Sequence, residues 1–374
     1  MGNPIFIFAG GGTGGHVYPG LAVAAELREM CPTAKVVFAC SNRPIDRKIL
    51  DPTPYAVVVQ PVRPLPSPRR PAEWFGFLRT YLASAAQARQ MVADLRPAGV
   101  LGLGGFAAGP VVCRAAKAGV RTGLLNPDAV PGKANRMLAR RVEAIFTQFA
   151  ATTEHFAAAV RPKVHAVGCP IRREFASPDR AEAVRHFGLL PDRKTLLVNG
   201  GSLGAASIND ALACFAGDLD ELAGTWQLLH VTGPAKSAPA SAADAPARAL
   251  HVCTLEYCQR MDLAYAAADL ALSRAGAGTI AELTATATPA VLMPYPYHAD
   301  QHQRLNARPL ADAGAAAIVD DAKDGPANAR RLRDVLLPIL RQPDRLAGMQ
   351  QASGTIRRAD AAERVARWLL GEAI

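Results

Sequence analysis

Four glycine-rich loops each follow an apolar run, and each could present backbone N–H groups to an anion. The first, at residues 10–16, contains five glycines and ends in His16. The other three span residues 102–106, 200–205 and 273–279. Glycine lets the main chain approach a phosphate closely, and the N-terminus of the following helix adds a partial positive charge. Because open α/β sheets bind ligands at the carboxyl ends of their strands, these loops predict a nucleotide-linked substrate.

The spacing of the first loop departs from the commonest nucleotide motifs. It lacks the Gly-Lys-Ser/Thr ending of a P-loop. Its match to the Gly-x-Gly-x-x-Gly pattern is imperfect, and the second predicted strand ends in Ala39, Cys40 and Ser41 where a dinucleotide-binding protein has a ribose-binding acid. These departures weigh against an NAD-dependent oxidoreductase. A non-catalytic nucleotide-binding scaffold and a plain tight turn remain as alternatives.

Short apolar runs that alternate with longer helical patterns predict the elements that position these loops. Strands are expected at residues 4–8, 35–39, 55–60, 99–103, 122–125, 144–147, 195–199, 226–232, 270–273 and 290–294. Helices are expected at residues 17–30, 75–95, 110–118, 205–215, 261–267, 278–285 and 354–370. The repeated β–α pattern restarts after residue 162, which predicts an α/β fold of two halves with parallel sheets. Residues 233–249, rich in Pro, Ala and Ser, are expected to form a surface loop.

The composition limits the possible classes of function. The length of 374 residues suggests two domains. The seven cysteines include no Cys-x-x-Cys pair, which disfavours a disulfide framework or a cysteine zinc site. No apolar run approaches the roughly 18 residues of a membrane span. The net charge of +10 favours anionic partners or simply a solvated basic surface, but no run of five basic residues occurs, so nucleic acid is disfavoured as a partner.

Seven motifs occur in an order that is typical of one family. They are GGGTGGHVYPGLAVAAEL (10–27), VLGLGGFAAGP (100–110), PGKANRML (131–138), VGCPIRREF (167–175), GGSLGAASIN (200–209), SRAGAGTIAEL (273–283) and DQHQRLNARPL (300–310). On these motifs the chain resembles the MurG family of GT-B glycosyltransferases over nearly its whole length. The resemblance implies an inverting transfer of N-acetylglucosamine from UDP-N-acetylglucosamine to the 4-hydroxyl of MurNAc in lipid I. The product would be lipid II for peptidoglycan synthesis, and neither a metal nor another cofactor would be needed.

The resemblance also implies two Rossmann-like domains whose parallel sheets face each other across a cleft. Residues 1–165 would form an N-terminal domain that binds the acceptor and the membrane. Residues 166–353 would form a C-terminal domain that binds the UDP-sugar. Residues 354–374 would form a C-terminal helix that packs back on the N-terminal domain.

The site residues that the resemblance implies fall into two groups. For the donor, Arg172 and Ser202 would contact the diphosphate, Glu282 the ribose hydroxyls, and the backbone of Cys258 the uracil edge. The other donor contacts would come from the backbone N–H groups of Ala277, Gly278 and Thr279, from Gln303 and Asn306 at the sugar hydroxyls, and from Thr13, Gly14, Gly15 and Asp128. The acceptor diphosphate would meet Gly14, Gly15, Gly104 and Gly105.

The attacking hydroxyl must lose a proton, and a histidine with a near-neutral pKa can accept it. We therefore expect His16 to be the general base, the alternative being that it only orients the loop or binds acceptor phosphate. The family usually has His-Glu-Gln-Asn where residues 125–128 of this chain are Leu-Asn-Pro-Asp. Asp128 therefore stands beside His16 as a second candidate base. The same departure keeps open a related GT-B transferase that uses another lipid or metabolite acceptor.

Residues 61–89 combine five arginines with apolar side chains, which suits the anionic face of a bilayer. The aromatic and aliphatic residues expected at the membrane are Trp74, Phe75, Phe77, Leu78 and Tyr81. An ordinary helix that faces the core is the alternative interpretation. In the resembling family this region docks on the inner leaflet, so we expect a peripheral protein on the cytoplasmic side of the inner membrane.

Overall fold

The structure is a computed structural model that describes residues 3–374 except 68–69, 178, 202–203, 235–248 and 298–299. It divides into two compact units, Met1–Arg172 together with Asp360–Ile374, and Arg173–Ala359. The sequence prediction placed the first boundary after residue 165 and the second after residue 353. Both divisions of the structure lie six or seven residues later along the chain.

The first unit is built on a parallel sheet of seven strands in the order β3-β2-β1-β4-β5-β6-β7. Its central strands are short and almost wholly apolar, as expected for a sheet that is covered on both faces. The strands are β1 Ile5–Gly10, β2 Lys35–Cys40, β3 Ala56–Val59, β4 Gly99–Gly104, β5 Arg121–Asn126, β6 Ala144–Thr147 and β7 Val164–Ala166. This is the strand order of a Rossmann fold, in which ligands bind where the order reverses, beside β1 and β4.

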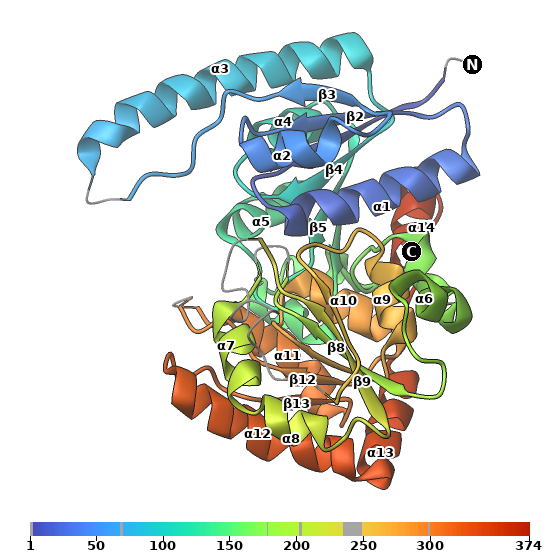
Figure 1. Cartoon of the computed structure of the whole chain (residues 1–374). Coiled ribbons are helices and arrows are strands. Elements are labelled where there is room, and N and C mark those ends of the chain that lie inside the picture. Colours follow the sequence, from blue (N-terminus) through green and yellow to red (C-terminus); the bar gives the residue numbers. More distant parts are fainter. Residues whose placement is uncertain (1–2, 68–69, 178, 202–203, 235–248, 298–299) are drawn as a thin grey trace. The chain divides into compact units, whose positions relative to one another are not determined.

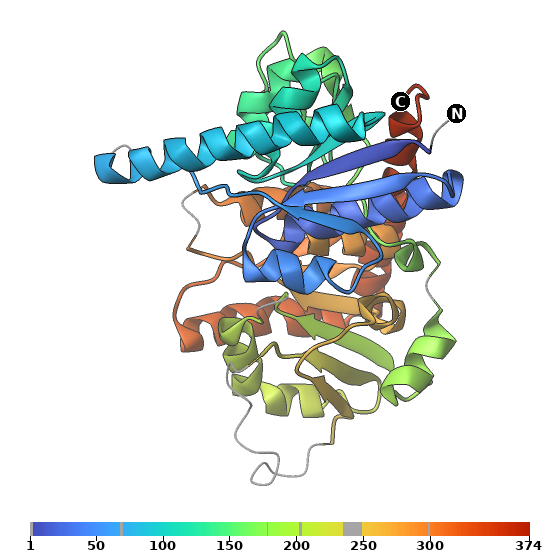
Figure 2. The ribbon, with the colours of Figure 1, turned by 90° about the horizontal axis from the view of Figure 1, so that it is seen from above.

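Helices and short 3₁₀ segments connect these strands (Figures 1 and 2). The helices are α1 Gly14–Met30, α2 Pro44–Leu50, α3 Pro71–Leu95, α4 Ala108–Lys117, α5 Lys133–Leu138 and α14 Ala361–Leu369. The 3₁₀ segments are η1 Ala139–Arg141, η2 Ala150–His155 and η3 Arg161–Lys163. The N-terminal turns of α3 project beyond the sheet of this unit in both views.

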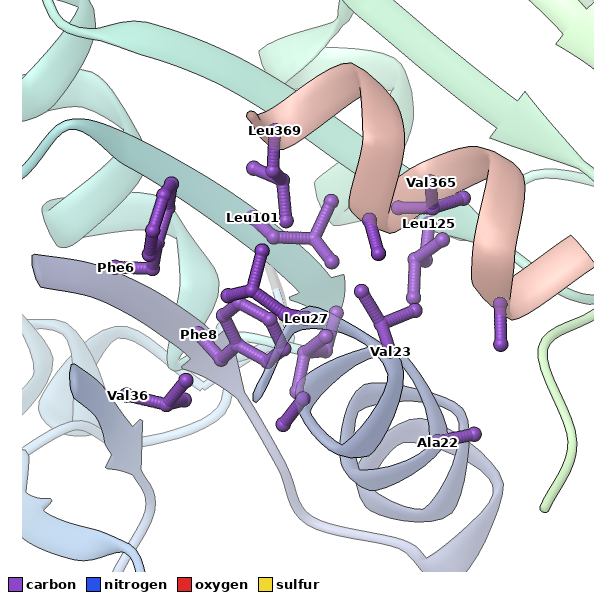
Figure 3. Close-up of a cluster of buried hydrophobic side chains, with 14 of the residues drawn as sticks. Phe6, Phe8, Ala22, Val23, Leu27, Val36, Leu101, Leu125, Val365 and Leu369 are labelled. Carbon is purple, nitrogen blue, oxygen red and sulfur yellow. The ribbon is translucent and has the colours of Figure 1, made fainter. Parts of the chain in front are cut away.

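The last helix, α14, completes the hydrophobic core of the first unit (Figure 3). Val365 and Leu369 point toward the side chains of α1 and of the central strands, and both are buried. Trp368 packs edge-on against Phe146 of β6 at 5.3 Å between ring centroids, and the Arg121 guanidinium lies 5.2 Å from the Trp368 ring centroid. The C-terminal end of the chain is therefore a structural part of the N-terminal unit.

The second unit repeats the same plan with six parallel strands in the order β10-β9-β8-β11-β12-β13. The strands are β8 Lys194–Asn199, β9 Trp226–Val231, β10 Val252–Leu255, β11 Leu270–Ser273, β12 Ala290–Leu292 and β13 Ala316–Ile318. The helices are η4 Arg173–Ala176, α6 Arg180–Phe187, α7 Ala206–Cys214, α8 Ala216–Asp220, α9 Met261–Ala267, α10 Ala277–Thr286, α11 His302–Asp312, α12 Gly325–Arg341 and α13 Pro343–Thr355. The chain therefore has the expected α/β fold with two parallel-sheet units.

The sequence prediction did not include three edge strands, the helices α2, α5, α6, α8, α11 and α12, or most of α13. The strands β7, β10 and β13 are only partly buried and are interrupted by polar or small residues, so they give no clear apolar run. The helix expected at residues 354–370 is two helices, because α13 ends at Thr355 and α14 begins at Ala361. Most of the loop expected at residues 233–249 lies outside the described residues. Within the described part of the chain, no helix is both long and apolar enough to cross a membrane.

Candidate active site

The first glycine loop connects β1 to α1, and at its start the chain is packed so closely that side chains are excluded. A Cβ atom on Gly11 would lie 2.3 Å from the Asp46 carboxylate. One on Gly105, in the loop after β4, would lie 2.5 Å from the carbonyl oxygen of Gly11. Gly12 and Gly105 also have φ values of 94° and 74°, which other residues rarely adopt. Close packing therefore requires glycine at Gly11 and Gly105, and the backbone conformation favours it at Gly12.

Asp46, which lies in α2, holds this loop by hydrogen bonds. The sequence patterns did not identify it as a residue of the site. Its two carboxylate oxygens lie 2.7 and 2.9 Å from the backbone nitrogen of Gly12. The backbone N–H of Ser41 donates to the same carboxylate at 3.2 Å, and the Ser41 hydroxyl donates as well. Asp46 is fully buried. Because Gly12 donates its N–H to Asp46, the N–H groups that an anion could use are those of the first turn of α1, at Thr13, Gly14 and Gly15.

His16 lies in the first turn of α1 and is half-buried. Its Nδ1 is 3.2 Å from the carbonyl oxygen of Gly11 and 3.2 Å from the Thr13 hydroxyl. A carbonyl oxygen can only accept, so the Gly11 contact favours the tautomer with the proton on Nδ1 and a lone pair on Nε2. Burial lowers the pKa of His16 below its ordinary value of 6.5, although the charges of Asp128 and Asp46 and the Gly11 contact oppose this. His16 is therefore held as a neutral base at neutral pH.

The segment that carries Asp128 is held by a buried amide network. The Asn126 side chain donates to the backbone oxygen of Asp128 at 2.7 Å. The Asn135 side chain, from α5, donates to Asn126 at 3.0 Å and to the carbonyl oxygen of Leu125 at 2.9 Å. Asn135 belongs to the motif at residues 131–138, and its function here is to fix the loop that sets the Asp128 charge near His16.

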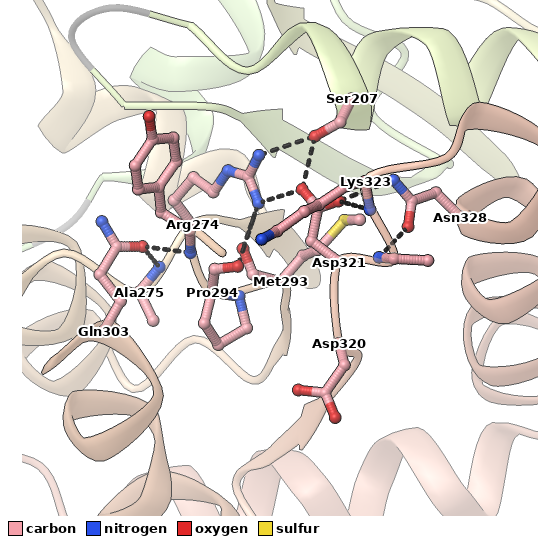
Figure 4. A network of polar contacts seen from close by, with 12 residues as sticks. Ser207, Arg274, Ala275, Met293, Pro294, Gln303, Asp320, Asp321, Lys323 and Asn328 are labelled. Carbon is pink, nitrogen blue, oxygen red and sulfur yellow. Dashed lines mark hydrogen bonds and ion pairs between the residues drawn. The ribbon is translucent and has the colours of Figure 1, made fainter. Parts of the chain in front are cut away.

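In the second unit, a buried network ties the loop at residues 273–279 to its neighbours (Figure 4). The Arg274 guanidinium donates to the carbonyl oxygen of Met293 at 2.9 Å and to the Ser207 hydroxyl at 2.7 Å, and it pairs with Asp321 at 3.0 Å. Burial raises the pKa of Asp321, but hydrogen bonds from the Lys323 N–H, Asn328, Ser207 and Arg274 outweigh it, so the pKa is lowered overall. Arg274 is therefore a structural residue of this loop.

Gln303 and Asn306 support the same loop from α11. The Gln303 side-chain oxygen accepts from the backbone N–H groups of Ala275 and Tyr295 at 3.2 and 3.0 Å. Asn306 is fully buried, and its side chain donates to the carbonyl oxygen of Ala275 at 3.3 Å. These contacts place both residues beneath the start of α10, where Ala277, Gly278 and Thr279 form the first turn.

Glu282 follows one turn further along α10 and is half-buried. The hydroxyl of the buried Tyr265, from α9, lies close to Glu282 and to Asn199 at the end of β8. Burial, together with the nearby Glu282 charge, holds the pKa of Tyr265 well above its usual range. Cys258 is also buried. The carboxyl end of the second sheet therefore gathers a helix N-terminus, a carboxylate and a buried phenol.

Comparison with known proteins identifies the family. Residues 6–147 match the glycosyltransferase family 28 N-terminal domain, and residues 195–365 match the family 28 C-terminal domain. The chain belongs to glycosyltransferase family 28. Membership decides against the oxidoreductase that the glycine loops had left open.

Close relatives of this glycosyltransferase carry one name. A protein of Clavibacter michiganensis subsp. michiganensis is 37% identical over 97% of this chain and 95% of its own length. One of Chlorobaculum parvum is 38% identical over 93% of each. Both are named UDP-N-acetylglucosamine--N-acetylmuramyl-(pentapeptide) pyrophosphoryl-undecaprenol N-acetylglucosamine transferase. Among solved structures, Acinetobacter baumannii MurG matches with a TM-score of 0.76 and 25% identity over 99% of this chain and all of its own.

The family 28 fold brings together part of the predicted site in each unit. In the first unit, Thr13, Gly14, Gly15 and His16 lie on one helix start, next to Gly104 and Gly105, since a Cβ on Gly104 would lie 3.1 Å from the His16 Nε2. In the second unit, residues 277–279 and Glu282 lie on α10. Arg172 is the last residue of the first unit, and Ser202 lies outside the described residues.

The aromatic residues of α3 lie mainly on the surface of the glycosyltransferase. The exposed fractions are 78% for Phe75 and 54% for Leu78, with Trp74 and Tyr81 near 40%. Phe77 is half-buried, and its ring lies 5.9 Å from that of Trp74. Most of these side chains therefore lie outside the core, whereas the C-terminal half of α3 does face it through Ala88, Met91 and Val92.

Proposed function

We propose that this glycosyltransferase transfers N-acetylglucosamine from UDP-N-acetylglucosamine to the 4-hydroxyl of MurNAc in lipid I and so forms lipid II. The observation that carries the proposal is His16, a neutral imidazole with its Nε2 lone pair available at the start of α1. Support comes from the names of relatives that match over more than nine-tenths of the chain.

The proposed chemistry is a single inverting displacement. The MurNAc hydroxyl oxygen bonds to the anomeric carbon while the bond from that carbon to the UDP oxygen breaks. The hydroxyl proton passes to Nε2 of His16, a step for which a neutral histidine is suited. The nearby Asp128 carboxylate stabilises the imidazolium that forms, because opposite charges attract and both groups are partly buried.

The donor is assigned to the second unit. Glu282 accepts hydrogen bonds from the ribose hydroxyls, and the backbone of Cys258 contacts the uracil. The first turn of α10, at residues 277–279, directs N–H groups at the diphosphate and, with Arg172 and Ser202, stabilises the charge of the departing UDP. Gln303 contacts the sugar, and Asn306 acts through the loop that it holds.

A membrane-bound acceptor would account for the exposed apolar side chains of α3. A polyprenyl acceptor stays in a membrane, so the enzyme must approach the lipid surface. The exposed apolar residues of α3 are interspersed with Arg79, which is also exposed, on a helix that projects from the sheet (Figure 1). We propose that this face docks on the anionic cytoplasmic leaflet and that the protein is peripheral there.

The decisive experiment is a turnover assay with labelled UDP-N-acetylglucosamine and a short-chain lipid I. We expect UDP release and a product heavier than the acceptor by one N-acetylglucosamine residue. UDP release only with a different acceptor would indicate a related transferase. This is the alternative that the Leu-Asn-Pro-Asp segment at residues 125–128 keeps open. Donor binding without turnover of any acceptor would indicate a non-catalytic scaffold.

A further inference from the structure

Arg43 lies where the two glycine loops of the first unit meet. It is the residue that precedes α2, and its Nη1 donates to the carbonyl oxygen of Gly12 at 3.0 Å. Its guanidinium carbon lies 5.4 Å from the centroid of the Phe106 ring, which belongs to the loop after β4. A Cβ atom built on Gly12 would contact both side chains, at 3.7 Å from Arg43 and 3.8 Å from Phe106. Arg43 therefore bridges the loop after β1 and the loop after β4.

The Arg43 guanidinium has hydrogen-bond donors that remain for a ligand. Within the described part of the chain, Arg43 forms no ion pair, and its Nε and Nη2 make no hydrogen bond. The residue is exposed to solvent. The contact with the Phe106 ring and the bond to Gly12 restrict the guanidinium, so a ligand would gain its remaining hydrogen bonds at reduced further cost in side-chain entropy.

The negative charge of Asp46 would repel a diphosphate bound at this loop unless a nearby cation offset it. Asp46 is a fully buried carboxylate that accepts hydrogen bonds from neutral groups of Gly12 and Ser41. A diphosphate bound at the start of α1 would be separated from the Asp46 carboxylate only by the loop of residues 11–12, and the two negative charges would repel each other. A helix N-terminus contributes only about half a charge. An arginine on the same loop offsets the repulsion and can bind phosphate oxygens with two parallel hydrogen bonds.

We propose that Arg43 binds the diphosphate of the lipid-linked acceptor, an inference that rests on the proposed function. Arg43 then completes a site made of the first turn of α1 and the loop after β4. We expect this site to prefer a diphosphate over a monophosphate, because a second phosphate offers more negative charge and more oxygens to the guanidinium anchored at Gly12.

The test compares binding and turnover in three variants. Arg43→Gln removes the charge but keeps a side-chain amide that can still donate to Gly12. Arg43→Lys keeps the charge and loses the planar pair of donors. Arg47→Gln is the matched control, since Arg47 lies on the same α2 helix, is exposed and pairs with Asp51.

Binding of a short-chain polyprenyl diphosphate, the matching monophosphate and UDP is measured by calorimetry. We expect Arg43→Gln to weaken diphosphate binding by about 10- to 100-fold, in keeping with the loss of a charge-assisted hydrogen bond. Arg43→Lys should weaken it less, Arg47→Gln should match wild type, and UDP binding should not change. The preference of the wild type for diphosphate over monophosphate should narrow in Arg43→Gln.

Equal diphosphate affinity in Arg43→Gln and wild type would overturn the inference, and so would weaker UDP binding, which would assign Arg43 to the donor. A fall in melting temperature with no change in any affinity would leave Arg43 a purely structural bridge and would also overturn it. The binding measurement needs no turnover, so it is independent of the proposed reaction. Failure of wild-type turnover with short-chain lipid I would count against the proposed function alone.

Discussion

His16 is positioned by two features that act on its proton affinity in opposite directions. Burial at the start of α1 lowers its pKa, and the Asp128 carboxylate raises it. The Gly11 carbonyl holds the ring by Nδ1 and leaves Nε2 for the substrate. Burial and the Asp128 charge are the larger effects on the pH at which the base becomes protonated, whereas the Gly11 contact raises the pKa to a smaller extent and decides which nitrogen reacts.

The first prediction concerns the pH profile of this base. His16→Ala should lower kcat by about 10²- to 10⁴-fold at saturating acceptor, the usual contribution of a positioned general base. In the wild type, kcat/KM should fall on the acidic side with a pKa below the ordinary histidine value of 6.5, because the pKa of His16 is lowered. Near wild-type turnover in His16→Ala would contradict the assignment.

Asp128→Asn separates the two candidate bases within the same experiment. If His16 is the base, removal of the Asp128 charge lowers the pKa of His16 further, so the acidic limb moves to lower pH and activity at neutral pH is partly kept. If Asp128 is the base, activity is lost across the whole pH range. A profile measured from pH 5 to 8 distinguishes these results.

Local patterns predicted His16 and the glycine loops, but not the residues that support them. A run of glycines after an apolar run is visible within about ten residues of sequence. Asp46 and Arg43 reach Gly12 from 34 and 31 positions away, and only the pairing of β1 with β2 brings them there. Such residues cannot be assigned before the sheet order is known.

At the level of elements, α3 differs from the other helices in the large apolar side chains that it exposes. Phe75, Leu78 and Leu82 are more than half exposed, and the helix start lies beyond the edge of the sheet. A soluble protein rarely keeps such a group of side chains in water unless it binds something. The sequence predicted this helix from its length and periodicity, but only the fold shows which of its faces is free.

The second prediction therefore concerns binding to vesicles. The double variant Phe75→Ser with Leu78→Ser should weaken binding to anionic liposomes by about 2–4 kcal/mol, or roughly 30- to 1000-fold, because two apolar side chains no longer enter the bilayer. The melting temperature should stay the same, since neither side chain is buried. Flotation with and without anionic lipid measures the effect.

Leu190→Ser is the matched control, because Leu190 is 40% exposed and belongs to the second unit. It should bind vesicles as wild type does. A double variant on α3 that floats as well as wild type would rule out this face as the membrane contact.

At the scale of the whole molecule, the two units differ in how the chain builds them. The second unit is continuous from Arg173 to Ala359, whereas the first needs both ends of the chain. The core of the first unit includes Val365, Trp368 and Leu369 of α14. The first unit cannot complete its core until α14 has been synthesised, although its sheet comes earlier in the sequence.

The third prediction follows from this discontinuity. Trp368→Ala should destabilise the first unit by about 3–5 kcal/mol, the usual cost of deleting a buried aromatic side chain. Hydrogen exchange followed by mass spectrometry should show faster exchange in β1, β4, β5 and β6, with β8 and β11 unchanged. Trp226→Ala is the counterpart in the second unit, where the indole is buried and donates to the carbonyl oxygen of Leu340 at 3.0 Å, and it should give the reverse pattern. If Trp368→Ala loosened the strands of both units equally, the two units would be one cooperative body, and the assignment of α14 to the first core would not explain the stability of the molecule.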